Sequence, residues 1–193
     1  MLKKDLRKIY LTHQRSLSAV ERLEKSQAIS ELFFENFALE KTKFLHIFLP
    51  IEKNNEIETE FIYRRIWQTF PNLKTAVPRI NVEANELENI SFTPETKLKA
   101  NAWQIFEPVG NKLIEPQLLD LVVVPLLCFD ERGFRVGYGK GYYDRFLARC
   151  RADCQKVGVN YFLPIREISD SHQFDVTLDF CITPERVWRF QTD

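Results

Sequence analysis

A short run of glycines and cations is the part of this sequence whose residue types could do chemistry. Residues 133–145 read Gly-Phe-Arg-Val-Gly-Tyr-Gly-Lys-Gly-Tyr-Tyr-Asp-Arg, and this run holds four of the six glycines of the chain. Glycine lets a ligand approach the backbone closely, and backbone N–H groups together with Arg135, Lys140 and Arg145 could surround a phosphate. The pattern therefore predicts a nucleotide or phosphate site.

The spacing of these glycines matches neither of the two common glycine fingerprints. A Walker A motif needs a glycine five residues before Gly139, where the chain has Phe134, and a Ser or Thr after Lys140, where it has Gly141. The dinucleotide pattern Gly-x-Gly-x-x-Gly is also absent. A loop that merely turns a tight corner is the alternative, and the neighbouring cations favour the phosphate site over it.

Three acidic segments could complete such a site. Asp144 follows Gly141 by three residues, so it is either an acid in the first turn of a helix or a ligand for a phosphate-bound Mg²⁺. Asp175 either caps its own loop or supplies a second carboxylate. Residues 56–60 read Glu-Ile-Glu-Thr-Glu, which is either an ordinary acidic first turn or a carboxylate partner for the adjacent N–H donors of an amino-pyrimidine.

Four aromatic side chains could stack on a flat heterocycle, although such residues more often belong to the core. They are Trp103, Phe106, Tyr142 and Tyr143. The three histidines show no metal-ligand spacing and receive no catalytic role. The four cysteines include no Cys-x-x-Cys pair, and we expect them to be free thiols.

The charge balance excludes one broad class of protein. Lys plus Arg and Asp plus Glu both total 27, so the chain lacks the basic field of a non-specific nucleic-acid binder. No stretch approaches the roughly 20 apolar residues that a membrane-spanning helix needs. We therefore expect a soluble, cytoplasmic monomer that binds neither nucleic acid nor membrane.

Helical and strand patterns alternate along the chain. We expect helices over residues 2–13, 18–37 and 58–70 and a further helix after Gly141, with strands over 44–49, 74–77, 87–93, 121–127, 157–159 and 180–183. This order predicts an α/β fold, a Rossmann-like three-layer α/β/α sandwich with a mostly parallel or mixed sheet, formed as a single domain over 1–193. Ligands bind at the carboxyl ends of the strands in such sheets, and the glycine run follows the most apolar strand.

Taken together, these segments resemble the 5-formyltetrahydrofolate cyclo-ligase family, also called 5,10-methenyltetrahydrofolate synthetase. The specific part is the glycine run ending in Gly141-Tyr142-Tyr143-Asp144. The other matching pieces occur in order along nearly the whole chain. They are Lys3-x-x-x-Arg7, Phe48-Leu49 followed by Glu56-Ile57-Glu58-Thr59, Pro125 to Asp130, and Asp175-x-x-Leu178-Asp179. The loop 52–55 is longer than the family pattern leads us to expect.

The resemblance implies ATP-dependent closure of 5-formyltetrahydrofolate to 5,10-methenyltetrahydrofolate, with ADP and phosphate as products and Mg²⁺ as the cofactor. The implied small-molecule partners are thus ATP and the folate. The implied ATP contacts are Lys3, Lys4, Asp5, Leu6, Arg7, Arg135, Val136, Gly137, Tyr138, Gly139, Lys140, Gly141, Tyr142 and Tyr143. The implied folate contacts are Arg7, Ile51 and Glu58. Our own hypothesis adds Trp103 and Tyr143 as side chains that stack on the pterin. Asp144 and Asp175 are the implied Mg²⁺ ligands.

The mechanism that we expect moves the γ-phosphoryl group of ATP to the formyl oxygen, after which N10 of the folate closes the ring. Lys140 and Arg135 are the expected catalytic residues, since their charge would stabilise the moving phosphoryl group. Two alternatives stay open at this point. One is a Rossmann-like sugar-phosphate isomerase, which needs no ATP, and the other is a nucleotide-binding module without chemistry.

Overall fold

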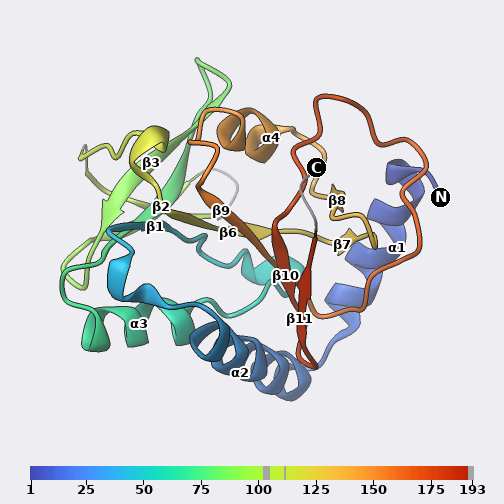
Figure 1. The fold of residues 1–193 in the computed structure, drawn as a ribbon, viewed down its shortest axis with the longest axis horizontal. Coiled ribbons are helices and arrows are strands. Elements are labelled where there is room, and N and C mark those ends of the chain that lie inside the picture. Colours follow the sequence, from blue (N-terminus) through green and yellow to red (C-terminus); the bar gives the residue numbers. More distant parts are fainter. Residues whose placement is uncertain (102–104, 111, 191–193) are drawn as a thin grey trace.

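A seven-stranded sheet forms the centre of the computed structural model, which describes residues 1–101, 105–110 and 112–190 (Figure 1). The strand order is β11-β10-β9-β6-β1-β2-β3. The five strands from β10 to β2 run parallel, and β11 and β3 pair antiparallel at the two edges. The strands are β1 (Phe44–His46), β2 (Lys74–Asn81), β3 (Glu86–Phe92), β6 (Leu121–Pro125), β9 (Gln155–Val159), β10 (Phe180–Ile182) and β11 (Val187–Arg189). The expected α/β fold with a mostly parallel sheet is confirmed.

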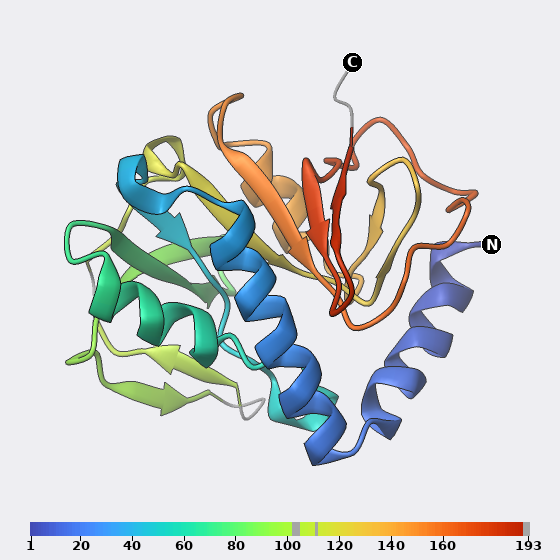
Figure 2. The same ribbon diagram turned by 60° about the horizontal axis from the view of Figure 1, so that its bottom comes forward.

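Helices cover both faces of this sheet (Figures 1 and 2). They are α2 (Ala19–Asn36) and α3 (Glu60–Thr69) on one face and α4 (Tyr142–Leu147) on the other, whereas α1 (Lys3–Ser16) packs against residues 128–136 beside the sheet. Short 3₁₀ turns lie at η1 (Leu39–Lys41), η2 (Glu52–Asn54) and η3 (Pro116–Leu118). Alternate residues of β6 point to opposite faces, as a strand requires. Val123 packs in the cluster of α2 and α3, whereas Val124 packs with Phe146 of α4. Burial on both faces explains why β6 is apolar at successive positions.

The start of α2 follows its sequence signal. The Ser18 hydroxyl accepts a hydrogen bond from the Glu21 N–H at 3.2 Å, and the Glu21 carboxylate accepts one from the Ser18 N–H at 2.9 Å. This reciprocal pair satisfies two backbone donors that a helix start leaves open. In the described part of the chain, no helix is both long and apolar enough to cross a membrane.

Several strands differ from the expectation. β1 ends at His46, and β2 continues through Pro78 to Asn81, because it pairs with β3 beyond the end of β1. Pro78 lies past Ala76, the last residue that β2 pairs with β1, so its missing N–H costs no ladder bond on that side. Two short strands, β4 (Leu98–Ala100) and β5 (Phe106–Pro108), form a separate antiparallel pair that the sequence pattern did not indicate.

The glycine run does not lead directly from strand to helix. Its first part belongs to an antiparallel hairpin of β7 (Cys128–Phe129) and β8 (Arg135–Val136). Gly133 forms the turn of this hairpin with φ of 87°, and its N–H donates to the Asp130 carbonyl at 3.0 Å. A Cβ there would lie 2.8 Å from the Phe190 ring. Only residues 137–141 form the loop that enters α4, so Gly133 has a structural role.

Candidate active site

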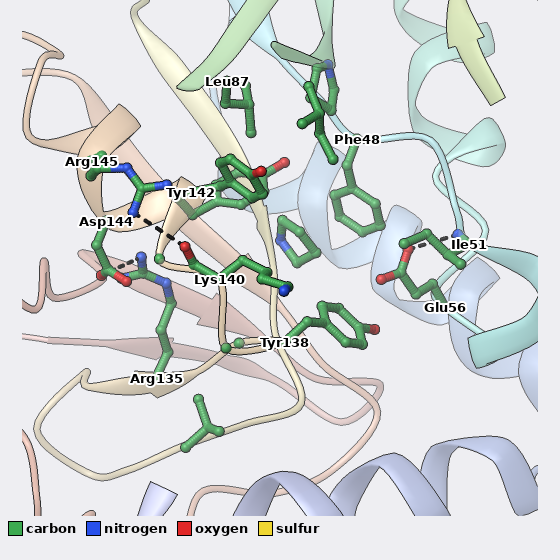
Figure 3. Close-up of a pocket in the computed structure, with 18 of the residues that line it drawn as sticks. Phe48, Ile51, Glu56, Leu87, Arg135, Tyr138, Lys140, Tyr142, Asp144 and Arg145 are labelled. Atoms are coloured by element: carbon green, nitrogen blue, oxygen red, sulfur yellow. Dashed lines mark hydrogen bonds and ion pairs between the residues drawn. The ribbon is translucent and has the colours of Figure 1, made fainter. Parts of the chain in front are cut away.

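A cavity of about 940 Å³ lies at the carboxyl ends of β1, β2 and β6, where the parallel sheet predicts a site. Its wall combines α1, the segment after β1, the β2–β3 hairpin, the glycine loop with α4, and the loop around Asp175. Figure 3 shows the residues from the segment after β1, from β3 and from the glycine loop with α4. Segments that are far apart in the sequence therefore meet in one place. The volume is within the range of sites that hold small organic ligands.

Most of the residues expected from the sequence line this cavity. They are Lys3, Arg7, Ile51, Arg135, Val136, Gly137, Tyr138, Gly139, Lys140, Gly141, Tyr142, Tyr143, Asp144 and Asp175. Phe106 also lines it, whereas Trp103 lies outside the described residues.

Of the segment 3–7, only Lys3 and Arg7 line the cavity. Lys4, Asp5 and Leu6 are not among the lining residues. Helical spacing explains the difference, because residues four apart, such as Lys3 and Arg7, share one face of α1. Leu6 points elsewhere and is buried in a small apolar cluster with Cys128 and Val136.

Of the acidic segment 56–60, the structure brings Glu56 rather than Glu58 to the cavity. Glu58 forms an ion pair with Arg22 at 3.2 Å and is not among the lining residues. Glu56 lines the cavity instead, and its carboxylate accepts a hydrogen bond from the Ile51 N–H at 2.7 Å (Figure 3). The signal for Glu56 was present in the cluster of three acids, but which acid faces the cavity depends on the path of the loop 52–55.

Burial gives Glu56 an unusual electrostatic state. Desolvation raises the pKa of Glu56 to about 7, although hydrogen bonds from the Tyr138 hydroxyl and the Ile51 N–H oppose this shift. Gln14 fixes the position of Tyr138 beside Glu56. Its side-chain N–H groups donate to the Tyr138 hydroxyl at 3.1 Å and to the Asn54 carbonyl at 2.8 Å. At neutral pH, Glu56 is therefore poised between its protonated and ionised forms.

The glycine loop is joined to α1 by Arg7. Its Nε donates to the Gly137 carbonyl at 3.0 Å, and a Cβ at Gly139 would lie 3.0 Å from the guanidinium carbon. Gly139 has φ of 94°, so both its conformation and this close approach favour glycine. Lys140 is exposed on the cavity wall, and no hydrogen bond or ion pair of its ammonium group is seen among the described residues. This cation is available to a ligand.

Arg135 has a different environment from Lys140. Its side chain is only 5% exposed; one amino group donates to the Asp144 carboxylate at 2.8 Å and the other donates to the Val176 carbonyl. Desolvation lowers the pKa of Arg135, and the negative charges of Asp144 and Asp175 oppose that shift. Arg135 therefore fixes the orientation of Asp144 at the cavity wall.

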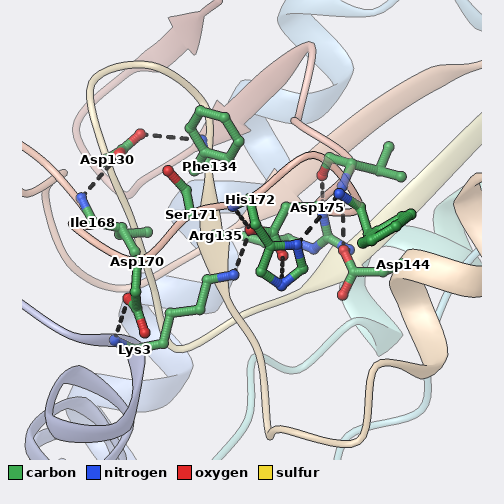
Figure 4. A network of polar contacts seen from close by, with 12 residues as sticks. Lys3, Asp130, Phe134, Arg135, Asp144, Ile168, Asp170, Ser171, His172 and Asp175 are labelled. Carbon is green, nitrogen blue, oxygen red and sulfur yellow. Dashed lines mark hydrogen bonds and ion pairs between the residues drawn. The ribbon is translucent and has the colours of Figure 1, made fainter.

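Asp175 belongs to the polar network that also contains Arg135 and Asp144 (Figure 4). Its carboxylate pairs with the Lys3 ammonium at 2.5 Å and accepts the His172 N–H at 2.8 Å. Burial opposes ionisation here, but these hydrogen bonds lower the pKa of Asp175 below its usual value. Asp175 thus caps its own loop and lines the cavity at once, so the two alternatives from the sequence are compatible.

The two aspartates fit a metal ion that arrives with phosphates. Magnesium is usually held by one or two carboxylates together with substrate oxygens and water. Asp144 and Asp175 both line the cavity near Arg135. Within the described residues, no group of three or more His, Cys, Asp or Glu side chains could hold a metal ion. Asp144 and Asp175 are the two carboxylates of this cavity that the sequence predicted as metal ligands.

Sequence comparison finds the same family that the motifs resemble. Residues 1–183 match the profile of the 5-formyltetrahydrofolate cyclo-ligase family. A Mus musculus protein named 5-formyltetrahydrofolate cyclo-ligase is 32% identical over 155 residues, which cover 77% of this chain and 74% of the mouse protein.

Structure comparison agrees. The NMR structure of Aquifex aeolicus 5,10-methenyltetrahydrofolate synthetase has a TM-score of 0.78 at 30% identity and covers 100% of this chain and 95% of its own. A 5,10-methenyltetrahydrofolate synthetase from Mycoplasma pneumoniae has a TM-score of 0.72 at 24% identity, with 95% and 99% of the two chains covered. The second likeness supports the fold alone.

Proposed function

Because the chain belongs to the 5-formyltetrahydrofolate cyclo-ligase family, we propose that its cavity binds ATP and 5-formyltetrahydrofolate side by side and closes the folate ring. The activity is the ATP-dependent formation of 5,10-methenyltetrahydrofolate, with release of ADP and phosphate. One observation supports this arrangement. The glycine loop with Lys140 and the buried acid Glu56 line different parts of the same cavity. A monomer working in the cytoplasm stays a prediction from the sequence.

The chemistry requires activation of a formamide. Its oxygen is a very poor leaving group until the γ-phosphoryl group is transferred to it, which makes the formyl carbon electrophilic. N10 of the same folate then attacks that carbon, loses its proton and closes the five-membered ring as phosphate departs. Since this second step is intramolecular, good positioning supplies much of the rate, with effective molarities of about 10⁵ M or more for well-oriented groups.

The phosphate side of the site consists of Lys140, Arg7 and the loop backbone. The Lys140 ammonium stabilises charge on the phosphoryl group as it moves, which is the main form of catalysis in phosphoryl transfer. Arg135 contributes by holding Asp144 in place. Asp144 and Asp175 would hold Mg²⁺, which when bound supplies positive charge to the phosphate oxygens.

The folate side of the site centres on Glu56 rather than Glu58. A carboxylate presents two oxygens at the spacing of adjacent N–H donors, which the aminopyrimidine part of a pterin carries. Ile51 and Tyr143 line the same cavity and would contact the ring. The ionised form of Glu56 is the form that accepts both hydrogen bonds.

Folate affinity is therefore expected to depend on pH. Because the pKa of Glu56 is raised to about 7, the free enzyme loses the binding-competent carboxylate as pH falls through 7. kcat/KM for 5-formyltetrahydrofolate should rise with pH and level off above about pH 8. In Glu56→Gln we expect KM for the folate to rise about 10- to 100-fold, the range for a hydrogen bond to a charged group. Initial rates at saturating MgATP between pH 6 and 9 measure both effects.

Glu58→Gln is the matched control for this experiment, because Glu58 faces Arg22 outside the cavity. It should keep the pH profile and KM of the wild type. If Glu58→Gln flattened the profile and Glu56→Gln did not, the assignment of the two acids would be reversed.

The function itself is tested by mixing purified protein, MgATP and 5-formyltetrahydrofolate and following the near-ultraviolet absorbance of the methenyl product. We expect an ATP-dependent increase that excess EDTA abolishes. The isomerase alternative requires no ATP, so folded protein without any ATP-dependent signal would contradict the proposal.

A further inference from the structure

A buried histidine lies directly behind the cavity wall. His46, the last residue of β1, is fully buried, and its Nε2 lies 3.1 Å from the hydroxyl oxygen of Tyr143 on α4. Its Nδ1 lies 2.5 Å from the side-chain oxygen of Asn89 on β3, which is 2% exposed. The His46 ring also packs against the rings of Tyr143 and Phe146, at centroid distances of 5.7 and 4.9 Å. Of this group, Tyr143 lines the cavity and His46 and Asn89 do not.

The partners of His46 fix the direction of each hydrogen bond. An amide oxygen only accepts, so Nδ1 of His46 carries the hydrogen that Asn89 receives. Burial lowers the pKa of His46 to about 4, so the ring is neutral near pH 7 and its Nε2 is an acceptor. A tyrosine phenol carries its hydrogen near pH 7. The Tyr143 hydroxyl therefore donates its single hydrogen to His46.

This direction determines what Tyr143 offers to a ligand. A hydroxyl has one hydrogen and two lone pairs. Because the hydrogen is committed to His46, the oxygen presents only acceptor capacity to the cavity. Such a group attracts an N–H donor and disfavours a carbonyl or ring nitrogen at the same place. The reduced pterin of 5-formyltetrahydrofolate carries N–H donors, whereas the transferring phosphates of ATP carry acceptors.

We propose that His46 is a positioning residue for folate binding, which holds Tyr143 in the cavity wall and makes its hydroxyl an acceptor-only group for an N–H of the reduced pterin. The inference rests on the proposed function. It assigns a role to a histidine whose sequence context indicated none, and which lies 97 residues from its partner.

Two substitutions separate this role from simple packing. The amide of His46→Gln reaches the position of Nε2 and supplies an acceptor to Tyr143, whereas His46→Asn matches Nδ1 and leaves Tyr143 without its partner. We expect KM for 5-formyltetrahydrofolate to rise about tenfold in His46→Asn, the loss expected for one positioned hydrogen bond. KM for ATP and kcat should stay within about twofold, and His46→Gln should restore most of the folate affinity.

Tyr143→Phe completes a cycle with His46→Asn. If His46 acts through the hydroxyl, the double variant binds folate no worse than Tyr143→Phe alone. Equal KM values for His46→Asn and His46→Gln, or additive losses in the double variant, would overturn the proposal. Thr75→Val is a control for buried polar loss, because the Thr75 hydroxyl bonds to the Phe92 carbonyl and to Trp67 outside the cavity. It should lower stability and leave the folate KM unchanged.

A measurement on the wild-type protein tests the proposal even if these variants do not fold. In ¹⁵N-histidine-labelled protein near pH 7, NMR should show His46 as the neutral tautomer with hydrogen on Nδ1. A hydrogen on Nε2 would reverse the bond to Tyr143 and overturn the proposal. Wild-type protein without cyclo-ligase activity would instead contradict the proposed function, so the two failures are distinguishable.

Discussion

Replacing Lys140 by alanine is expected to lower kcat about 10²- to 10³-fold, the size of effect seen when one positioned donor to a developing charge is removed. Lys140 is exposed on the cavity wall, and its ammonium shows no partner among the described residues, so the folded protein does not depend on it. The free energy of unfolding should therefore stay within about 0.5 kcal/mol of the wild type, as for an ordinary surface substitution. The side chain acts on the reaction and not on the fold.

Steady-state rates at saturating substrates, together with denaturant unfolding, measure these two quantities. Lys4→Ala is the matched control: Lys4 is a lysine on α1 that the family resemblance placed among the ATP contacts, and it is not among the cavity-lining residues. It should keep kcat within about twofold, since surface changes away from a site have small effects. Near-wild-type turnover in folded Lys140→Ala would remove Lys140 from the mechanism.

Local signals in the sequence predicted that the glycine loop lines a cavity. Gly139, Lys140 and Gly141 are neighbours in the chain, so no long-range information is needed to place them together. Lys3 and Arg7, the two residues of α1 that line the cavity, show the limit of what a local motif predicts. The motif spans five positions. The helical period places its first and last residues on the face of α1 that lines the cavity.

The part of the cavity around Glu56 and Tyr143 was harder to predict because it depends on contacts between distant segments. Whether Glu56 or Glu58 faces the cavity depends on the path of η2 and on the ion pair that Glu58 forms with Arg22. The pairing of His46 with Tyr143 joins β1 to α4, and no periodicity in the sequence could indicate it. Long-range polar pairs of this kind are set by tertiary packing.

The same distinction between local and long-range information explains which strands the sequence analysis predicted and which it missed. The continuous apolar run of β6 predicts a buried central strand, and the structure confirms it. The hairpin of β7 and β8 has only two residues in each strand, which is too short for an alternating pattern. The edge strand β11 is only partly buried, so it carried no apolar run to mark it.

Replacing Arg135 by alanine is expected to lower both stability and turnover, in contrast to Lys140→Ala. The substitution removes a buried guanidinium, leaves the Val176 carbonyl without a donor, and leaves the Asp144 carboxylate with only the Val176 N–H, at 3.3 Å. Breaking a buried ion pair from one side costs about 3–5 kcal/mol. Because the Asp144 side chain is 35% exposed, water compensates part of that loss, and we expect about 2–3 kcal/mol. kcat should fall at least about 10²-fold, because Asp144 loses the contact that orients it.

Two further variants separate the structural from the chemical part of this effect. Arg135→Lys keeps a positive charge but not the planar fork that reaches both acceptors, so it should recover some stability and little turnover. In Arg135→Ala/Asp144→Ala, the unpaired carboxylate is gone, and stability should partly return while turnover stays low. Rates are compared at a temperature at which all variants are folded. Recovery of turnover in the double variant would mean that Asp144 is dispensable, and that the carboxylate needed at the phosphate side is Asp175 alone.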